Sequence, residues 1–244
     1  MKKTVLMAYI LILSTLYSLA QPIDSVKKMP TAKPPRVLKM DVKHIIIDLQ
    51  FDWDKKQAFG SSTILLNTLQ ETNNIYLDAG MMSIGSISLS NGTLLKYSYD
   101  GSDKNDALKI TLDRPYKPNE EVKLKINYRT IWTNEIDPDY LSGTNGKGLR
   151  FSTPTFNDPI KPKEIWSIGE PESNRYWFPC YDAPNDLRTT EFIATVDKKL
   201  QVISNGKLIE CKTNTDNTKT YHWKSDIPYA NHLTSFVVGE FLDV

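Results

Sequence analysis

The chain has 244 residues, of which 40% are hydrophobic and 10% are aromatic, and this is enough apolar surface for a folded core. Its 30 basic residues nearly balance its 29 acidic residues, so the formal net charge is +1. Without a strong positive field, nucleic acid and anionic membrane surfaces are not expected as partners.

The first 20 residues have the pattern of a signal peptide. Lys2 and Lys3 precede the uncharged apolar run 5–16, and small residues at Ser18 and Ala20 suit a signal peptidase. A permanent anchor is less favoured because a bilayer span needs roughly 20 apolar residues. We expect cleavage after Ala20, a periplasmic or secreted protein, and no membrane contact after cleavage.

Residues 21–40 are predicted to form an extended tether, because they contain four prolines among lysines and have no hydrophobic period. From Asp41 onward the hydrophobic period is two. Residues 45–53 place apolar side chains on one face and polar ones on the other, and residues 122–132 do the same. Both segments are predicted strands. We expect residues 41–244 to form a single β-domain.

Shorter strands are expected between and after these two, separated by turn formers such as Asn91-Gly92 and Asp100-Gly101. They cover residues 59–66, 75–77, 84–89, 94–99, 108–112, 191–196, 202–204, 220–223 and 233–241. The last is apolar on both faces and should lie centrally in its sheet. No stretch keeps helical spacing over three turns, so we predict an all-β, antiparallel β-sandwich. Residues 134–167 and the segment after them are expected to form one long functional insertion.

A catalytic constellation is not found in this sequence. His44, His222 and His232 lack the spacing of a zinc motif, and there is neither a Gly-x-Ser-x-Gly elbow nor a phosphate-binding glycine loop. We therefore predict no catalytic residue and no metal ligand in this chain. Cys180 and Cys211 could form a disulfide in an oxidising compartment, but the apolar neighbours of Cys180 suit a buried free thiol, which we favour.

The segment Gly169–Asp186 reads GEPESNRYWFPCYDAPND. Its Gly-Glu-Pro start, Arg175, the Phe-Pro-Cys run, Asp182 and Pro184 resemble the GEP-x-x-x-R-x-x-FPC-x-D-x-P signature of the aminopeptidase N family, the gluzincin zinc aminopeptidases. That signature belongs to the amino-terminal domain. Residues 202–206 are similar to the family's V-x-SNG element, and residues 233–239 are similar to its closing strand. Residues 148–152 are similar to its GLY-x-S strand, with Phe151 one place later than the usual tyrosine. The resemblance covers the chain from about residue 38 onward.

This resemblance implies a saddle-shaped β-sandwich whose long loop enters the cleft of a following thermolysin-like catalytic domain. Glu170 would then bind the free α-amino group of a peptide N-terminus, because a carboxylate forms a charge-assisted hydrogen bond with an ammonium group. Alternatively, Glu170 only caps a turn before Pro171. The family usually has glutamine where Ile168 stands, so the preferred substrate side chain stays open.

The resemblance also assigns the zinc and the His-Glu-x-x-His motif to the catalytic domain, and this sequence lacks that motif. We expect a chain truncated before that domain and inactive by itself. The alternative is a free-standing, non-catalytic sandwich that binds peptide or carbohydrate through Trp132, Trp166 and Tyr176, which are expected to be exposed. Arg175 and Asp182 are expected to pair bidentately and hold the loop, while Trp177 and Phe178 pack it onto the sheets.

Overall fold

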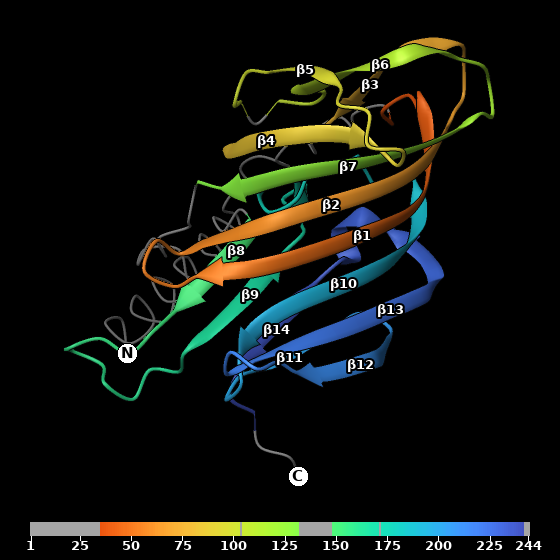
Figure 1. Ribbon diagram of the computed structural model, residues 1–244. Coiled ribbons are helices and arrows are strands. Elements are labelled where there is room, and N and C mark those ends of the chain that lie inside the picture. The colour runs from red at the N-terminus through yellow and green to blue at the C-terminus, as the bar shows by residue number, and fades with distance from the viewer. Residues whose placement is uncertain (1–34, 103, 132–147, 171, 242–244) are drawn as a thin grey trace, which may run out of the picture. The chain divides into compact units, whose positions relative to one another are not determined.

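The computed structural model describes residues 35–102, 104–131, 148–170 and 172–241, and these residues form three β-sheets (Figure 1). The signal peptide predicted for residues 1–20 and most of the predicted tether lie outside the described residues. In the described part of the chain, no helix is long and apolar enough to cross a membrane.

The largest sheet has seven strands. In spatial order they are β12 (Lys207–Thr213), β13 (Thr218–Ala230), β10 (Leu187–Asp197), β1 (Met40–Asp52), β2 (Gln57–Thr68), β7 (Glu121–Thr130) and β4 (Met82–Leu89). Neighbouring strands are antiparallel except for β1 and β10, which pair in parallel with Ile47 opposite Phe192. This pair departs from the antiparallel prediction. A parallel pair needs a long crossover connection, and the many residues between β1 and β10 provide one.

The second sheet has four antiparallel strands in the order β11 (Gln201–Ser204), β14 (Phe236–Gly239), β9 (Glu164–Ile168) and β8 (Gly148–Ser152). It lies behind the seven-stranded sheet in Figure 1. The third sheet has the order β3 (Thr72–Leu77), β6 (Leu108–Tyr116) and β5 (Lys96–Tyr99). Two short 3-10 helices, η1 (Asn174–Tyr176) and η2 (Asn231–Leu233), complete the described elements.

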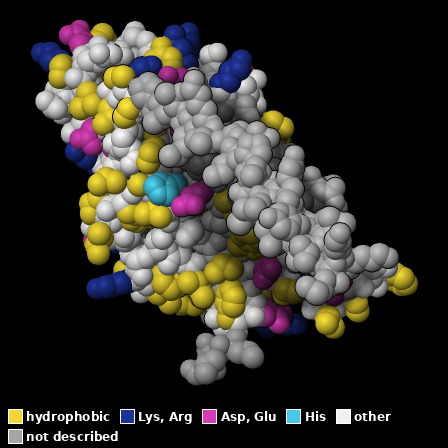
Figure 2. Space-filling view, turned by 180° about the vertical axis from the view of Figure 1, so that it is seen from behind, with side chains coloured by type: hydrophobic (Ala, Val, Ile, Leu, Met, Phe, Trp, Pro, Cys, Tyr) yellow, Lys and Arg dark blue, Asp and Glu magenta, His cyan; other side chains and the backbone are white. Residues whose placement is uncertain are grey.

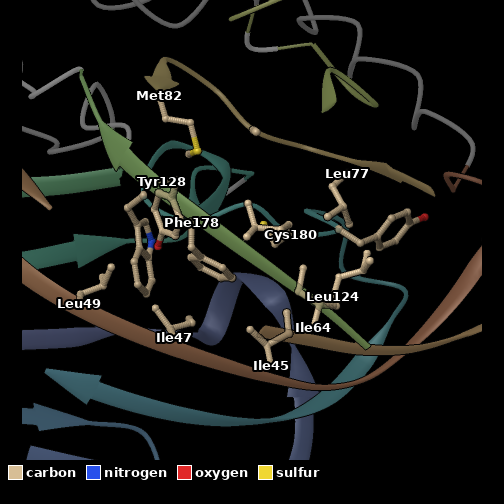
Figure 3. Packing of buried hydrophobic residues seen from close by; sticks show 14 of the residues in the cluster. Ile45, Ile47, Leu49, Ile64, Leu77, Met82, Leu124, Tyr128, Phe178 and Cys180 are labelled. Atoms are coloured by element: carbon tan, nitrogen blue, oxygen red, sulfur yellow. The ribbon is translucent and has the colours of Figure 1, made fainter. Parts of the chain in front are cut away.

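The hydrophobic core lies between the sheets, and the period-two pattern of β1 explains it. Ile45, Ile47 and Leu49 are fully buried and point to the inside of the domain, where Figure 3 shows Phe178 and Cys180 beside them. Burying one such aliphatic side chain contributes about 1.5–3 kcal/mol. Phe51 at the end of β1 joins the two larger sheets, since its ring centroid lies 5.6 Å from that of Phe236 on β14. The predicted all-β sandwich is confirmed.

Two predictions need correction, and one strand was missed. The insertion expected at residues 134–167 contains β8 and most of β9, which form one half of the four-stranded sheet. The predicted strand 233–241 is shorter, because Leu233 belongs to η2 and β14 covers only Phe236–Gly239, although β14 is central as expected. Finally, β12 was not predicted, since every residue of this edge strand is exposed and no alternation marks it.

Candidate functional site

The segment Gly169–Asp186, called the GEP segment below, connects β9 to β10 and contains η1. Gly169 allows it to begin close to η2, because a Cβ atom there would lie only 2.2 Å from the carbonyl oxygen of His232. Only glycine permits so close a backbone approach. The first turn is closed by the Ser173 amide, which donates to the Gly169 carbonyl at 3.0 Å.

Glu170 lies on this first turn and is exposed. Its main-chain carbonyl accepts a hydrogen bond from the Ser173 hydroxyl at 3.2 Å. Within the described residues, its carboxylate forms neither an ion pair nor a hydrogen bond, so the side chain does not cap the turn. An exposed carboxylate without an internal partner can accept hydrogen bonds from an ammonium group.

The arginine and the aspartate that were expected to support the loop are paired. Arg175 donates from Nε to Oδ2 of Asp182 at 3.1 Å, and their side chains are 4% and 1% exposed. The Arg175 amide also donates to this oxygen at 3.1 Å, while Oδ1 of Asp182 accepts from the side chain of Asn231. The Asp182 carboxylate therefore accepts from one side-chain nitrogen and one main-chain nitrogen of Arg175. The bidentate pairing of the guanidinium with both carboxylate oxygens, which the sequence predicted, is not formed between these two described residues. Glu172, which is half-exposed, also accepts from Arg175.

Asp78 is a buried acceptor that the sequence did not reveal. One of its carboxylate oxygens accepts from the Asp182 amide at 2.7 Å, and the same carboxylate pairs with Arg36. Its main chain forms a two-way bridge with Cys180, with N to O distances of 2.7 and 3.0 Å. This residue directly follows β3 of the three-stranded sheet, so it ties the GEP segment to an element about a hundred residues earlier.

Asn231 in η2 is the second buried polar residue of this site that the sequence did not reveal, and it both donates and accepts hydrogen bonds. Its side chain donates to Asp182, its carbonyl accepts from the side chain of Asn174, and its amide oxygen accepts from Arg188. Asn174 in turn accepts from the indole nitrogen of Trp177 at 2.6 Å. The buried side of the GEP segment is thus a continuous polar network, which fixes its shape.

Two aromatic residues of the GEP segment, Trp177 and Phe178, lie in the core as predicted. Trp177 and Phe178 are fully buried, and the Trp177 ring lies 5.2 Å from Phe236 and 6.2 Å from Phe192. The expected exposure of Tyr176 is wrong, because this residue is 6% exposed. It packs against Gly80, where a Cβ atom would lie 2.7 Å from its ring. Trp166 is half-buried, and Trp132 lies outside the described residues.

Both cysteines are free thiols in the structure. Cys180 is fully buried, as its apolar neighbours predict, and burial raises its pKa well above the usual value. Cys211 is exposed on β12. Burial also raises the pKa of Asp182, although Arg175 opposes this shift, and it raises the pKa of Asp186 to about 6. None of these shifts creates a nucleophile or a general base on the exposed side of the segment.

The described residues offer no set of donors that fits a zinc ion. His44 and His222 lie on the outer face of the seven-stranded sheet, where the Nε2 atom of each faces Glu191, at 3.4 and 2.8 Å. No group of three or more histidine, cysteine or acidic side chains that could hold a metal is found among residues 35–102, 104–131, 148–170 and 172–241. We therefore derive no chemical step through a metal from these residues.

Comparisons with known proteins identify the fold. The family model described as the peptidase M1 N-terminal domain matches residues 40–233. A solved structure of a mutant M1 zinc metallopeptidase from Deinococcus radiodurans, bound to a Tyr-Ser-Ala substrate, superposes with a TM-score of 0.67 at 21% identity. The superposition covers 82% of this chain and 42% of that chain, and at this identity it shows a shared fold.

Two curated relatives have different names. Leucine aminopeptidase 2 of Vanderwaltozyma polyspora is 24% identical over 206 residues, which cover 82% of this chain and 29% of the relative. Transcription initiation factor TFIID subunit 2 of Gallus gallus is 34% identical over 97 residues, which cover 38% of this chain and 8% of the relative. The chain spans less than half of the length of each of these proteins.

Proposed function

Because the chain belongs to the family of peptidase M1 N-terminal domains, we propose that it is the substrate-anchoring domain of a zinc aminopeptidase and that Glu170 binds the α-amino group of a peptide. The observation that supports this role most is the exposed carboxylate of Glu170, which has no partner among the described residues. The similarity to leucine aminopeptidase 2 supports a peptide as the substrate class.

In this proposal the chain's own residues bind and orient, and they carry out no bond cleavage. Glu170 holds the ammonium group of the first residue, while the network around Asp182 and Asn231 keeps the turn from moving. A charged anchor at this point selects chain ends over internal peptide bonds, because an internal amide nitrogen carries no charge. A catalytic domain in the same polypeptide would supply the zinc, as the M1 zinc metallopeptidase relatives suggest. The signal-like residues 1–20 support a periplasmic or secreted location.

The proposal can be tested by binding to the chain itself. Trialanine with a free amino group should bind the wild type more tightly than N-acetyl-trialanine, by about ten- to a hundredfold for a charge-assisted contact. NMR titration of isotope-labelled protein measures both affinities. Glu170→Gln should remove the difference, whereas Glu172→Gln, which changes a neighbouring half-exposed acid, should keep it. Equal binding of both peptides by the wild type would refute the role of Glu170.

A second candidate function is an interaction domain without catalysis. It is favoured by the TFIID subunit 2 relatives, which are 34 and 36% identical over 97 residues and are named as transcription factor subunits. Under this alternative, free and acetylated peptides would bind equally and Glu170→Gln would have no effect. The same titration therefore separates the two functions.

A further inference from the structure

Arg150 lies at the centre of β8, the edge strand of the four-stranded sheet. It is paired across the sheet with Trp166 on β9. Phe151 and Ile165, the next pair, face the core, so Arg150 and Trp166 share the opposite, outer face. The guanidinium carbon of Arg150 lies 5.9 Å from the centroid of the Trp166 ring, which holds it by a cation–π contact.

Among the described residues, Arg150 is a buried charge without a counter-charge. The residue is 5% exposed, and its Nη1 atom is buried with no hydrogen-bond partner in the part of the chain that the structure describes. Burial lowers the pKa of its guanidinium, and no carboxylate in the described part of the chain opposes this shift. By contrast, the buried Arg175 is paired with Asp182 and the partly buried Arg36 with Asp78. An unpaired buried charge is costly, so its presence points to a ligand that supplies the missing anion.

The cross-strand row that contains Arg150 is otherwise apolar, whereas the next pair on the same face, Ser152 and Glu164, is polar. The sheet register places Ile203, Val237, Trp166 and Arg150 in one row across all four strands. Ile203 is 45% exposed, and Val237 and Trp166 are half-buried. Figure 2 views the molecule from the side of this sheet and shows exposed hydrophobic side chains on that side of the domain. A short peptide could place its side chains on this row while its charged ends bind elsewhere.

The position of Arg150 relative to Glu170 sets the size of such a ligand. Glu170 follows Trp166, the cross-strand partner of Arg150, by four residues along β9 and the first turn of the GEP segment. At about 3.3 Å per residue, the two positions are separated by at most about 13 Å along the strand. Because an extended peptide has the same rise, this span corresponds to a peptide of about two to four residues.

We propose that Arg150 binds the C-terminal carboxylate of a short peptide whose amino group is held by Glu170. Arginine suits this task because its planar guanidinium presents paired donors that match the geometry of a carboxylate. The inference rests on the proposed function of Glu170 and specifies its substrate class as free peptides of two to four residues. Longer chains would lose the second contact.

Three forms of trialanine test the inference on the 244-residue chain: the free peptide, its C-terminal amide and its N-acetyl derivative. By NMR titration, the wild type should bind the amide about ten- to a hundredfold more weakly than the free peptide, because a charge-assisted contact is lost. Arg150→Gln should bind free peptide and amide equally while still preferring the free amine to the N-acetyl form. Arg150→Lys should keep part of the preference for the free carboxylate. Glu170→Gln should show the reverse pattern.

The outcomes separate the two proposals. Equal binding of free peptide and amide by the wild type, with the N-acetyl form still disfavoured, would overturn the role of Arg150 and leave that of Glu170. Equal binding of all three forms would overturn both. Lack of binding of any form up to about 10 mM, which corresponds to a very weak complex, would also overturn both for this chain.

Thermal unfolding distinguishes a ligand-binding role of Arg150 from a purely structural one, because the two roles predict opposite changes of the unfolding temperature when Arg150 is replaced. Without peptide, Arg150→Met should unfold at the same temperature as the wild type or at a higher one, because it removes an unpaired buried charge. Free trialanine at a concentration that saturates the wild type should raise the unfolding temperature of the wild type more than that of Arg150→Met, which retains only the contact with Glu170. A lower unfolding temperature of the variant without peptide would show that Arg150 stabilises the fold, and it would contradict the inference.

Discussion

Removing Arg175 should destabilise the domain strongly and in a pH-dependent way. Its Nε atom lies 3.1 Å from Oδ2 of Asp182, and the two side chains are 4% and 1% exposed. Arg175→Met would leave the Asp182 carboxylate buried without its charge partner. Loss of one member of a buried ion pair costs about 3–5 kcal/mol. The free energy of unfolding at pH 8, measured with urea, should fall by that amount.

The pH dependence separates lost charge from lost packing. Burial already raises the pKa of Asp182, and Arg175 opposes the shift, so the variant should have a still higher pKa in the folded state. A carboxyl group with a raised folded pKa contributes stability that is present at low pH and is lost as pH rises through that pKa. Arg175→Met should therefore lower the free energy of unfolding less at pH 4 than at pH 8.

Arg129 provides a matched control for this experiment. It pairs with Asp52 at 3.8 Å, and their side chains are 39% and 25% exposed. Arg129→Met should cost no more than about 1 kcal/mol at either pH, because exposed ion pairs contribute little. The contrary outcome is that Arg175→Met lowers the free energy of unfolding by the same amount at pH 4 and at pH 8. Lost packing would then explain the effect, and the idea that the variant leaves Asp182 as an unpaired buried charge would be wrong.

Three further predictions concern the buried side of the same region. Burial raises the pKa of Asp186 to about 6 from 3.8, so the wild type should lose stability as pH rises from about 4 to about 6. Asp186→Asn should then be more stable than the wild type by about 1–3 kcal/mol at pH 8 and equal to it below pH 4, as urea unfolding can measure. A thiol reagent should modify Cys211 in the native protein and Cys180 only after denaturation, because burial blocks Cys180 and raises its pKa. Phe178→Ala should lower the free energy of unfolding by about 3–5 kcal/mol, since this side chain is fully buried, and a cost below 1 kcal/mol would contradict its place in the core.

The sequence predicts a strand most directly where the strand has one buried and one exposed face. In β1, Ile45 and Ile47 are fully buried while Asp48 and Gln50 are exposed, so the two-residue period is directly visible. The edge strand β12 buries neither face and leaves no such pattern. The parallel pairing of β1 with β10 could not be predicted, because register between distant strands depends on the packing of the whole sheet.

The site was predictable where its residues are close in sequence. Arg175 and Asp182 are seven residues apart within the GEP segment, and their pairing followed from that proximity. Asp78 and Asn231 contact the same segment from far along the chain, and no local pattern marks a buried acceptor of this kind. Tyr176 was misplaced for the same reason, since Gly80, which makes room for its ring, lies on another element.

Kinetics of a polypeptide in which this chain precedes an M1 zinc catalytic domain would test the role of Glu170 most directly. The specificity constant kcat/KM for a short peptide with a free amino group should fall by about thirty- to several-thousandfold in Glu170→Gln, which corresponds to about 2–5 kcal/mol for a lost charged anchor. Glu172→Gln should change it little. An unchanged kcat/KM in Glu170→Gln would contradict the proposal that this carboxylate holds the amino end of the substrate.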